Sequence, residues 1–303
     1  MEKSALFVGL ATLDFLYLTP KIPQVNEKLV AVDYTVAAGG PATNAAISFE
    51  YLRRLHKNSG STQLLASVGN HPLSRLIRTD LEVYGVHCID LDSQRIDPPP
   101  VSSILVTQPG GDRAVISINA THAQGAWNPD FSALLDNIQV LLIDGHQMAM
   151  SQELAQIAKA GKIPIIIDGG SWKPGFEGVL ALADTVITSA NFYPPGCDTH
   201  EQVMAYLIDL GIPQIAITQG EGAISYYTQG KQSHIAVPQG SAVDTLGAGD
   251  ILHGAFCYYS LELDFAEALA QSAKIASASV QQFGTRAWMK GEGGGIGEWR
   301  EGF

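Results

Sequence analysis

Cysteine is scarce in this chain of 303 residues, and the few cysteines are scattered. Cys88, Cys197 and Cys257 are odd in number, lie far apart and form no CxxC pair. They fit reduced thiols in a cytoplasmic protein, and they exclude a disulfide scaffold or a thiolate zinc site. The histidines include no HExxH and no other close pair, so we expect no zinc site built on histidine either.

Positive charge and long apolar runs are also lacking. Lys and Arg number 18 against 30 Asp and Glu, which gives a net charge of −12. General affinity for nucleic acid or an anionic membrane needs clustered Lys and Arg, so neither is an expected partner. No stretch approaches the roughly 18 apolar residues of a membrane span, and the N-terminus shows no signal-peptide pattern.

Three common catalytic motifs are missing as well. The sequence contains no GxxxxGK[ST], no GxGxxG after a strand and no GxSxG. Their absence excludes a P-loop, a dinucleotide-binding fingerprint and the simplest hydrolase interpretation.

Short apolar runs alternate with longer amphipathic segments, and this pattern predicts a mostly parallel sheet covered by helices on both faces. The predicted strands are 5–10, 139–143, 163–167, 185–188 and 214–218. The predicted helices are 41–56, 72–84, 151–160, 200–210, 248–261 and 265–282, with Ser151 and Thr199 as N-caps of two of them.

Two segments depart from this alternation of strands and helices, and they predict a separate small β-sheet. Residues 29–36 alternate apolar and polar positions, and residues 101–119 form a hairpin pattern around the turn at 108–111. We therefore expect one large α/β body from 1–11, 37–96 and 121–303, with a β lid from 12–36 and 97–120. The glycine-rich stretch 291–297 is expected to be a loose tail.

The sharpest local pattern is DTLGAGD, residues 244–250, followed by an apolar helix. A helix start stabilises an anion, because its first N–H groups are free and the positive end of the dipole lies there. Gly247 and Gly249 let a phosphate approach the backbone. A carboxylate in such a nest would repel phosphate, but Asp250 makes sense as the acceptor of a proton from a hydroxyl that attacks a phosphoryl group. The alternative is an ordinary helix start that carries an Asp.

A second glycine turn lies near the N-terminus, in AGGPATNAA at residues 38–46. Gly39 and Gly40 end a strand, and Pro41 begins a helix, where proline is favoured. Bare backbone together with the amide of Asn44 could bind the vicinal hydroxyls of a polyol. The alternative, a tight turn with no ligand, stays open on this pattern alone.

Together, GGPATN and DTLGAGD resemble the two signatures of the ribokinase-like (PfkB) carbohydrate kinase family. The resemblance runs from VGLATLDFL at Val8 to QQFGTRAW at Gln281. Among members, the chain looks most similar to ketohexokinase- and fructokinase-type enzymes, on VGLATLD, GGDR and LLIDGHQ. The resemblance implies a three-layer α/β/α fold with a small β-sheet lid.

The resemblance also implies roles for individual residues. The implied catalytic positions are the base Asp250 and an anion hole formed by the backbone of Gly247, Ala248 and Gly249. The implied substrate-binding residues are Asp14, Gly40, Asn44, Arg113 and Asp144. His146 competes with Asp144 for its place, and we favour Asp144 because Gly145 follows it.

On the nucleotide side, the resemblance implies that ATP is bound by Asn191, Thr218, Gly220, Gly222 and Gly284. The family's Asn-x-x-Glu is incomplete here, because Asn191 is followed by Phe-Tyr-Pro and the acid is missing. Protein ligands for Mg²⁺ are therefore unknown, and we expect phosphates and water to hold the ion. A monovalent cation near Asp244 stays open.

The function expected from the resemblance is ATP-dependent transfer of the γ-phosphoryl group to a hydroxymethyl group of a ketose or pentose. One alternative is a nucleoside kinase, with Phe15, Tyr17 and Phe49 as walls for a base. Another is a non-catalytic homologue that senses a sugar or nucleotide. The edges of the lid strands offer a surface for a homodimer, because unpaired strand edges tend to be covered.

Overall fold

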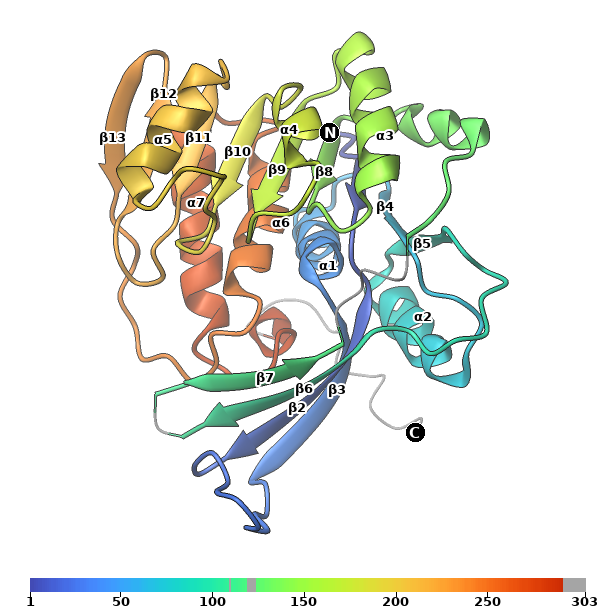
Figure 1. Ribbon diagram of the computed structural model, residues 1–303, viewed down its shortest axis with the longest axis vertical. Coiled ribbons are helices and arrows are strands. Elements are labelled where there is room, and N and C mark those ends of the chain that lie inside the picture. Colours follow the sequence, from blue (N-terminus) through green and yellow to red (C-terminus); the bar gives the residue numbers. More distant parts are fainter. Residues whose placement is uncertain (109, 119–123, 291–303) are drawn as a thin grey trace.

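The computed structural model describes residues 1–108, 110–118 and 124–290, in which a large sheet lies between two layers of helices (Figure 1). The strands of this sheet are β1 (Ala5–Val8), β4 (Thr62–Ala66), β5 (His87–Asp90), β8 (Val140–Ile143), β9 (Ile165–Gly169), β10 (Thr185–Thr188), β11 (Gln214–Ile217), β12 (Ile224–Thr228) and β13 (Lys231–Ile235). Their order is β13-β12-β11-β10-β9-β8-β1-β4-β5. The strands from β11 to β5 are parallel, and β12 and β13 extend the sheet antiparallel.

Helices cover both faces of this sheet, and each face has its own apolar core. One layer holds α1 (Pro41–Leu55), α6 (Ala248–Tyr259) and α7 (Phe265–Ser279), and the other holds α3 (Met148–Ala160), α4 (Phe176–Leu180) and α5 (His200–Asp209). The predicted three-layer α/β/α fold is confirmed. In the part of the chain described, none of the helices is at once long and apolar enough to cross a membrane.

A smaller sheet lies against one end of the body (Figure 1). Its strands are β2 (Thr12–Thr19), β3 (Asp33–Gly39), β6 (Val101–Thr107) and β7 (Arg113–Ser117), in the order β3-β2-β6-β7. The β2–β6 pair is parallel and the other two pairs are antiparallel. The segments predicted as a lid thus supply the strands, although β3 runs on to Gly39. The predicted tail at 291–297, and the chain between 119 and 123, lie outside the described residues.

Some predicted boundaries are wrong for clear physical reasons. The alternating stretch 29–36 becomes strand only from Asp33, because its partner β2 ends at Thr19 and Pro20 has no N–H to continue the ladder. Ser151 is not an N-cap: α3 begins at Met148, and the Ser151 hydroxyl donates to the carbonyl oxygen of Gln147 one turn back. Thr199 does cap α5, in a complete capping box.

Several elements gave no recognised signal. The sequence did not predict the strands β4, β5, β12 and β13. It also did not predict helix α4 or the 3₁₀ segments η2 (Pro129–Leu135) and η3 (Ala287–Lys290). In β12 and β13 most residues are half-buried or exposed, so no continuous apolar run marks them. Helix α2 (Pro72–Tyr84) was predicted with these bounds, and it packs against β2 and β3.

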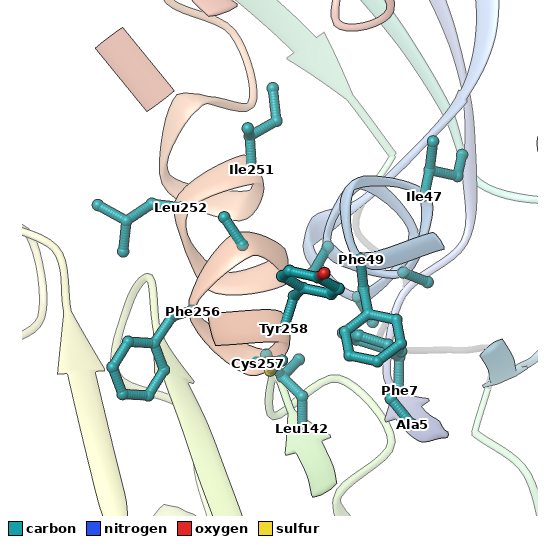
Figure 2. Close-up of a cluster of buried hydrophobic side chains, with 14 of the residues drawn as sticks. Ala5, Phe7, Ile47, Phe49, Leu142, Ile251, Leu252, Phe256, Cys257 and Tyr258 are labelled. Atoms are coloured by element: carbon teal, nitrogen blue, oxygen red, sulfur yellow. The ribbon is translucent and has the colours of Figure 1, made fainter. Parts of the chain in front are cut away.

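Helices α1 and α6 pack side by side, and their contact brings the two glycine turns together (Figure 2). The ring of Phe49 on α1 packs edge-on against Phe7 at 5.7 Å and against Tyr258 on α6 at 6.0 Å. A Cβ at Gly254 would lie 2.1 Å from the carbonyl oxygen of Ala45, so only glycine allows this approach. The N-terminal ends of both helices are thereby held next to each other.

Candidate active site

The site begins at the N-terminal end of α6. Gly247 precedes the helix with a φ of 71°, a left-handed conformation that favours glycine. A Cβ at Gly249 would meet nothing within 4 Å, so open space lies beside the first turn, where the backbone N–H groups have no partner within the helix. This turn has the room and the polarity to hold an anion. Gly247, Ala248 and Gly249 thus lie together at the N-terminal end of α6.

Asp250 lies within the same turn, and it is half-buried. One carboxylate oxygen, Oδ2, accepts a hydrogen bond of 2.8 Å from the side-chain amide of Asn44 on α1. Burial, and then the nearby Asp168 carboxylate, raise the pKa of Asp250 to about 6, against the opposing effects of Asn44 and His253. A carboxylate with this pKa is mostly ionised at neutral pH, yet it is a stronger base than an exposed aspartate.

The turn at Gly39 and Gly40, which we call the sugar-side turn, brings Asp14 to the edge of the same region. A Cβ at Gly39 would lie 1.8 Å from Oδ2 of Asp14, so the missing side chain leaves room for this carboxylate. Burial raises the pKa of Asp14 to about 6, and the nearby Ser102 hydroxyl and Arg286 charge work against that rise. Oδ1 of Asp14 is buried and has no hydrogen-bond partner in the described part of the protein. An acceptor left in this state suits a donor from a ligand, such as a hydroxyl.

Asp144 behaves differently from Asp14. Its Oδ2 accepts the N–H groups of Leu10 at 2.9 Å and Ala42 at 3.1 Å, and Oδ1 accepts the N–H of His146 at 2.9 Å. Burial alone would raise its pKa, but these N–H groups and the nearby His146 and Lys173 hold it at about 2. The carboxylate therefore ties the end of β1 to the start of α1, the helix that follows the Gly39–Gly40 turn.

The residues expected to bind ATP lie after β10 and β11 and beside Asp244. The Thr218 hydroxyl donates to the carbonyl oxygen of Thr188, and Gly220, with a φ of 62°, belongs to a tight turn closed by the N–H of Gly222. Gly284 donates its N–H to Asp244 at 2.9 Å. Asn191 is exposed after β10. Because β10 and β11 are parallel neighbours, their carboxyl ends meet at one edge of the sheet.

The small sheet contacts the α6 turn directly. The Arg113 guanidinium, at the start of β7, donates to the hydroxyl of Thr245 at 2.6 Å. Behind it, Leu246 and Phe283 pack against an apolar cluster on one face of the sheet, formed by Leu16, Leu18, Ile104 and Val106. Arg113 is thus placed beside the glycine turn.

Four polar residues of this region were not predicted as site residues. Arg286 donates to Asn44 and lies beside Asp80, and the charges of Asp168 and His253 act on Asp250. The ring nitrogens of His253 lie 2.7 Å from the carbonyl oxygen of Gly249 and 3.1 Å from that of Ile187. His253 is buried. Except for the contact of His253 with Gly249, four residues away, these partners are far apart in sequence, so a local pattern could not have found them.

Protein ligands for a metal ion are not gathered here. Across residues 1–108, 110–118 and 124–290, no three His, Cys, Asp or Glu side chains are grouped closely enough to hold one. Asp198 lies exposed at the start of α5, where its N–H donates to Gln202. This donor set fits a Mg²⁺ ion that arrives on nucleotide phosphates and keeps its waters, and it does not fit an all-protein cage.

Comparison with known proteins identifies the class. The profile of the pfkB family carbohydrate kinases matches residues 2–290. The chain belongs to the pfkB family of carbohydrate kinases. It is a phosphotransferase of the kind that acts on an alcohol group, and kinases of this family use ATP with Mg²⁺.

Individual relatives are distant but cover almost the whole chain. A deoxyribokinase of Salmonella typhi is 22% identical over 297 residues, covering 92% of this chain and 93% of the relative. The ribokinase structure from Giardia lamblia has a TM-score of 0.78 at 16% identity, covering 95% of this chain and 96% of that one. The Arabidopsis thaliana ribokinase, complexed with ribose and ATP, has a TM-score of 0.71 at 19% identity, covering 96% and 99%. These names do not support the expected nearer likeness to ketohexokinase- and fructokinase-type members.

The raised pKa of Asp250 predicts that this carboxylate destabilises the folded protein above about pH 6. The folded state binds the proton more tightly than the unfolded state, whose pKa is near 3.8, so stability falls as pH rises from about 4 to about 6. Asp250→Asn removes the buried charge. We expect it to raise the free energy of unfolding at pH 8 by about 1–3 kcal/mol, measured by urea denaturation, with a smaller gain at pH 4.

The control is Asp209→Asn, at the exposed end of α5, which should leave stability nearly unchanged at both pH values. An Asp250→Asn protein that is no more stable than wild type at pH 8 would show that burial of this carboxylate carries no such cost.

Proposed function

We propose that this protein transfers the γ-phosphoryl group of ATP to a hydroxymethyl group of a pentose or ketose. One observation carries the proposal: the half-buried Asp250 carboxylate, with its pKa at about 6, lies in an open helix N-terminal turn and accepts a hydrogen bond from Asn44 of the sugar-side turn. A base, an anion site and a polyol site are therefore adjacent. Phosphoryl transfer needs little more than this.

Asp250 is the proposed catalytic base. The substrate hydroxyl would give its proton to this carboxylate as the bond from its oxygen to the γ-phosphorus forms. The bond between that phosphorus and the β,γ-bridging oxygen breaks, and ADP leaves with the electron pair. The backbone N–H groups of Gly247, Ala248 and Gly249 would stabilise the charge on the transferred oxygens. Mg²⁺ bound with the nucleotide would supply further charge neutralisation.

On the nucleotide side we propose that Asn191, Thr218, Gly220, Gly222 and Gly284 bind ATP. Asn191, Thr218, Gly220 and Gly222 follow the neighbouring parallel strands β10 and β11, and Gly284 donates its N–H to Asp244 shortly before α6, which supports this assignment. A monovalent cation near Asp244 stays a prediction: the two oxygens of this carboxylate accept the backbone N–H groups of Leu246 and Gly284, and each keeps a further lone pair.

On the sugar side we propose that Asp14, Gly40 and Asn44 bind the substrate hydroxyls. The unpartnered Oδ1 of Asp14 supports this role, whereas Asp144 would act by holding the backbone of the turn. The names of the relatives favour ribose and 2-deoxyribose over a ketose. We propose that Arg113 and the small sheet cover the substrate and exclude water, which would suppress ATP hydrolysis.

The positions of three aromatic side chains argue against the alternative of a nucleoside kinase, which needs them to line a site for the base. Phe49 is buried in the core between α1 and the sheet. Phe15 and Tyr17 alternate with Asp14 and Leu16 along β2, so they lie on the opposite face of the small sheet from Asp14. The non-catalytic alternative rested on the missing acid of Asn-x-x-Glu, and the assembled base and anion turn argue against it.

The test is a coupled ADP-release assay over ribose, 2-deoxyribose, fructose, tagatose and adenosine, with the product identified by ³¹P NMR. We expect turnover of a pentose or ketose, and a loss of at least about 10³-fold in kcat for Asp250→Asn, since general base catalysis supplies about that factor. Asp209→Asn, the exposed control, should keep wild-type activity.

Two outcomes would contradict the proposal. ATP binding with turnover of none of the five compounds would remove the kinase assignment for these substrates. Activity of Asp250→Asn within a few-fold of wild type would remove Asp250 as the base.

We also propose a homodimer formed through the outer face of the small sheet. Strand register places Tyr17, Tyr34, Leu105 and Ile116 on one face, with Tyr34 exposed by 68% and Ile116 by 76%. A hollow of about 360 Å³ on this face is lined by Tyr17, Leu105 and residues between Pro23 and Ala31. An apolar face of this kind usually has a partner.

Light scattering after gel filtration tests the dimer. The molar mass of the wild type should be twice that of the chain. Ile116→Glu should be a monomer, because a dimer of this variant would bury the charge of the introduced carboxylate in the interface. Val83→Glu, at an exposed position of α2, is the matched control and should stay dimeric. A monomeric wild type at micromolar concentration would exclude this surface.

A further inference from the structure

Arg286 is a buried cation that lies next to the sugar-side turn, in the segment after α7. It is exposed by only 8%. Its Nη1 donates to Oδ1 of Asn44 at 2.8 Å and to the hydroxyl of Thr285 at 2.9 Å, and Nη2 donates to the carbonyl oxygen of Ala38. The Asp80 carboxylate lies 3.7 Å from Nη2 and accepts the N–H of Ala38 at 2.9 Å.

These contacts fix the direction of the Asn44 amide. A guanidinium can only donate hydrogen bonds, and an ionised carboxylate can only accept them. Asn44 lies between the two, so its oxygen must face Arg286 and its NH₂ group must face Asp250. The result is a continuous chain from Asp80 through Arg286 and Asn44 to Asp250, with hydrogen bonds of 2.8 Å on both sides of the amide.

We propose that Arg286 is a positioning residue for the phosphoryl transfer: it holds Asn44 so that the amide N–H is directed at the Asp250 carboxylate. The inference rests on the proposed function, because it assigns Asp250 as the base. Arg286 itself would touch neither the sugar nor ATP. It would act through the amide, by keeping a donor on the carboxylate before the substrate arrives.

The surroundings of Asp250 make this donor important. Asp168 from β9 and Asp144 from β8 both disfavour a second negative charge, and His253 on α6 favours it. Asn44 on α1 supplies the direct side-chain hydrogen bond to the carboxylate. A hydrogen bond to a charged group is worth roughly 10-fold or more in an equilibrium constant. If the amide turns away, the ionised form of Asp250 loses that factor.

A purely structural role for Arg286 makes a different prediction. Arg286 also ties the chain after α7 to Ala38, so its removal is expected to lower the melting temperature in either case. Only the positioning role predicts that the proton affinity of Asp250 changes as well. The pH dependence of the activity therefore distinguishes the two roles, whereas the stability of the variant does not.

The experiment compares wild type, Arg286→Gln and Arg286→Lys over pH 5–8.5 with the sugar that the wild type uses best. We expect the acid limb of kcat/KM to move upward by about one pH unit in Arg286→Gln, with about a tenfold loss of kcat/KM at pH 6. Arg286→Lys keeps the charge but not the fork of donors, so its shift should be smaller.

The matched control is Arg53→Gln, at the other end of α1. Arg53 is also mostly buried and donates to both oxygens of Glu50 and to the carbonyl oxygen of Asn58. We expect this variant to lose stability but to keep the wild-type acid limb. In an Asn44→Ala background, Arg286→Gln should add no further shift, since the amide through which it acts is absent.

Either of two results would overturn the inference. One is a wild-type acid limb in folded Arg286→Gln or, should that variant not fold, in Arg286→Lys. The other is an undiminished shift in the Asn44→Ala background. Titration of the Asp250 carboxyl carbon by ¹³C NMR, assigned with Asp250→Asn, gives the same comparison without turnover. A protein that phosphorylates no sugar would thus refute the proposed function and still leave the effect of Arg286 on Asp250 measurable.

Discussion

The burial of one ionisable carboxylate at the start of α6 is the constraint on which the rest of this site depends. Asp250 is partly withdrawn from water, and the cost appears as its raised pKa. The positive end of the α6 dipole, the amide of Asn44 and the nearby His253 offset part of that cost. The Asn44 amide that helps to make the ionised carboxylate tolerable also fixes one of its oxygens at the start of α6.

Close approach of backbone segments makes this arrangement possible. Gly254 lets α6 lie against α1, and this contact sets Asp250 opposite Asn44. Gly39 leaves room for Asp14 in the same way. The carboxylates then divide by environment. Asp144 has its pKa at about 2, held there by His146, Lys173 and backbone N–H groups, whereas burial raises those of Asp14 and Asp250 to about 6. Environments that separate pKa values in this way often separate roles.

Much of the fold and the centre of the site could be predicted from the sequence, because both depend on local patterns. Apolar runs that alternate with helices define the layers, and DTLGAGD and GGPATN define backbone turns within a few residues. The partners of those turns could not be predicted. Asn44 meets Asp250 across 206 positions, and Arg286 meets Asn44 across 242, with no pattern around Arg286 to mark it. The sequence marked Asp144 as a candidate for substrate binding, and only the structure reveals the three backbone N–H groups that it holds.

The central claim is that Asp250 receives the proton of the attacking hydroxyl while the α6 turn holds the phosphoryl group. A crystal structure with ADP, aluminium fluoride, Mg²⁺ and the preferred sugar tests it most directly. The account predicts a sugar hydroxymethyl oxygen within about 2.6–3.2 Å of the Asp250 carboxylate, with the fluoride ligands facing the N–H groups of Gly247, Ala248 and Gly249. A hydroxymethyl group bound away from Asp250, or an anion bound elsewhere than at this turn, would contradict it.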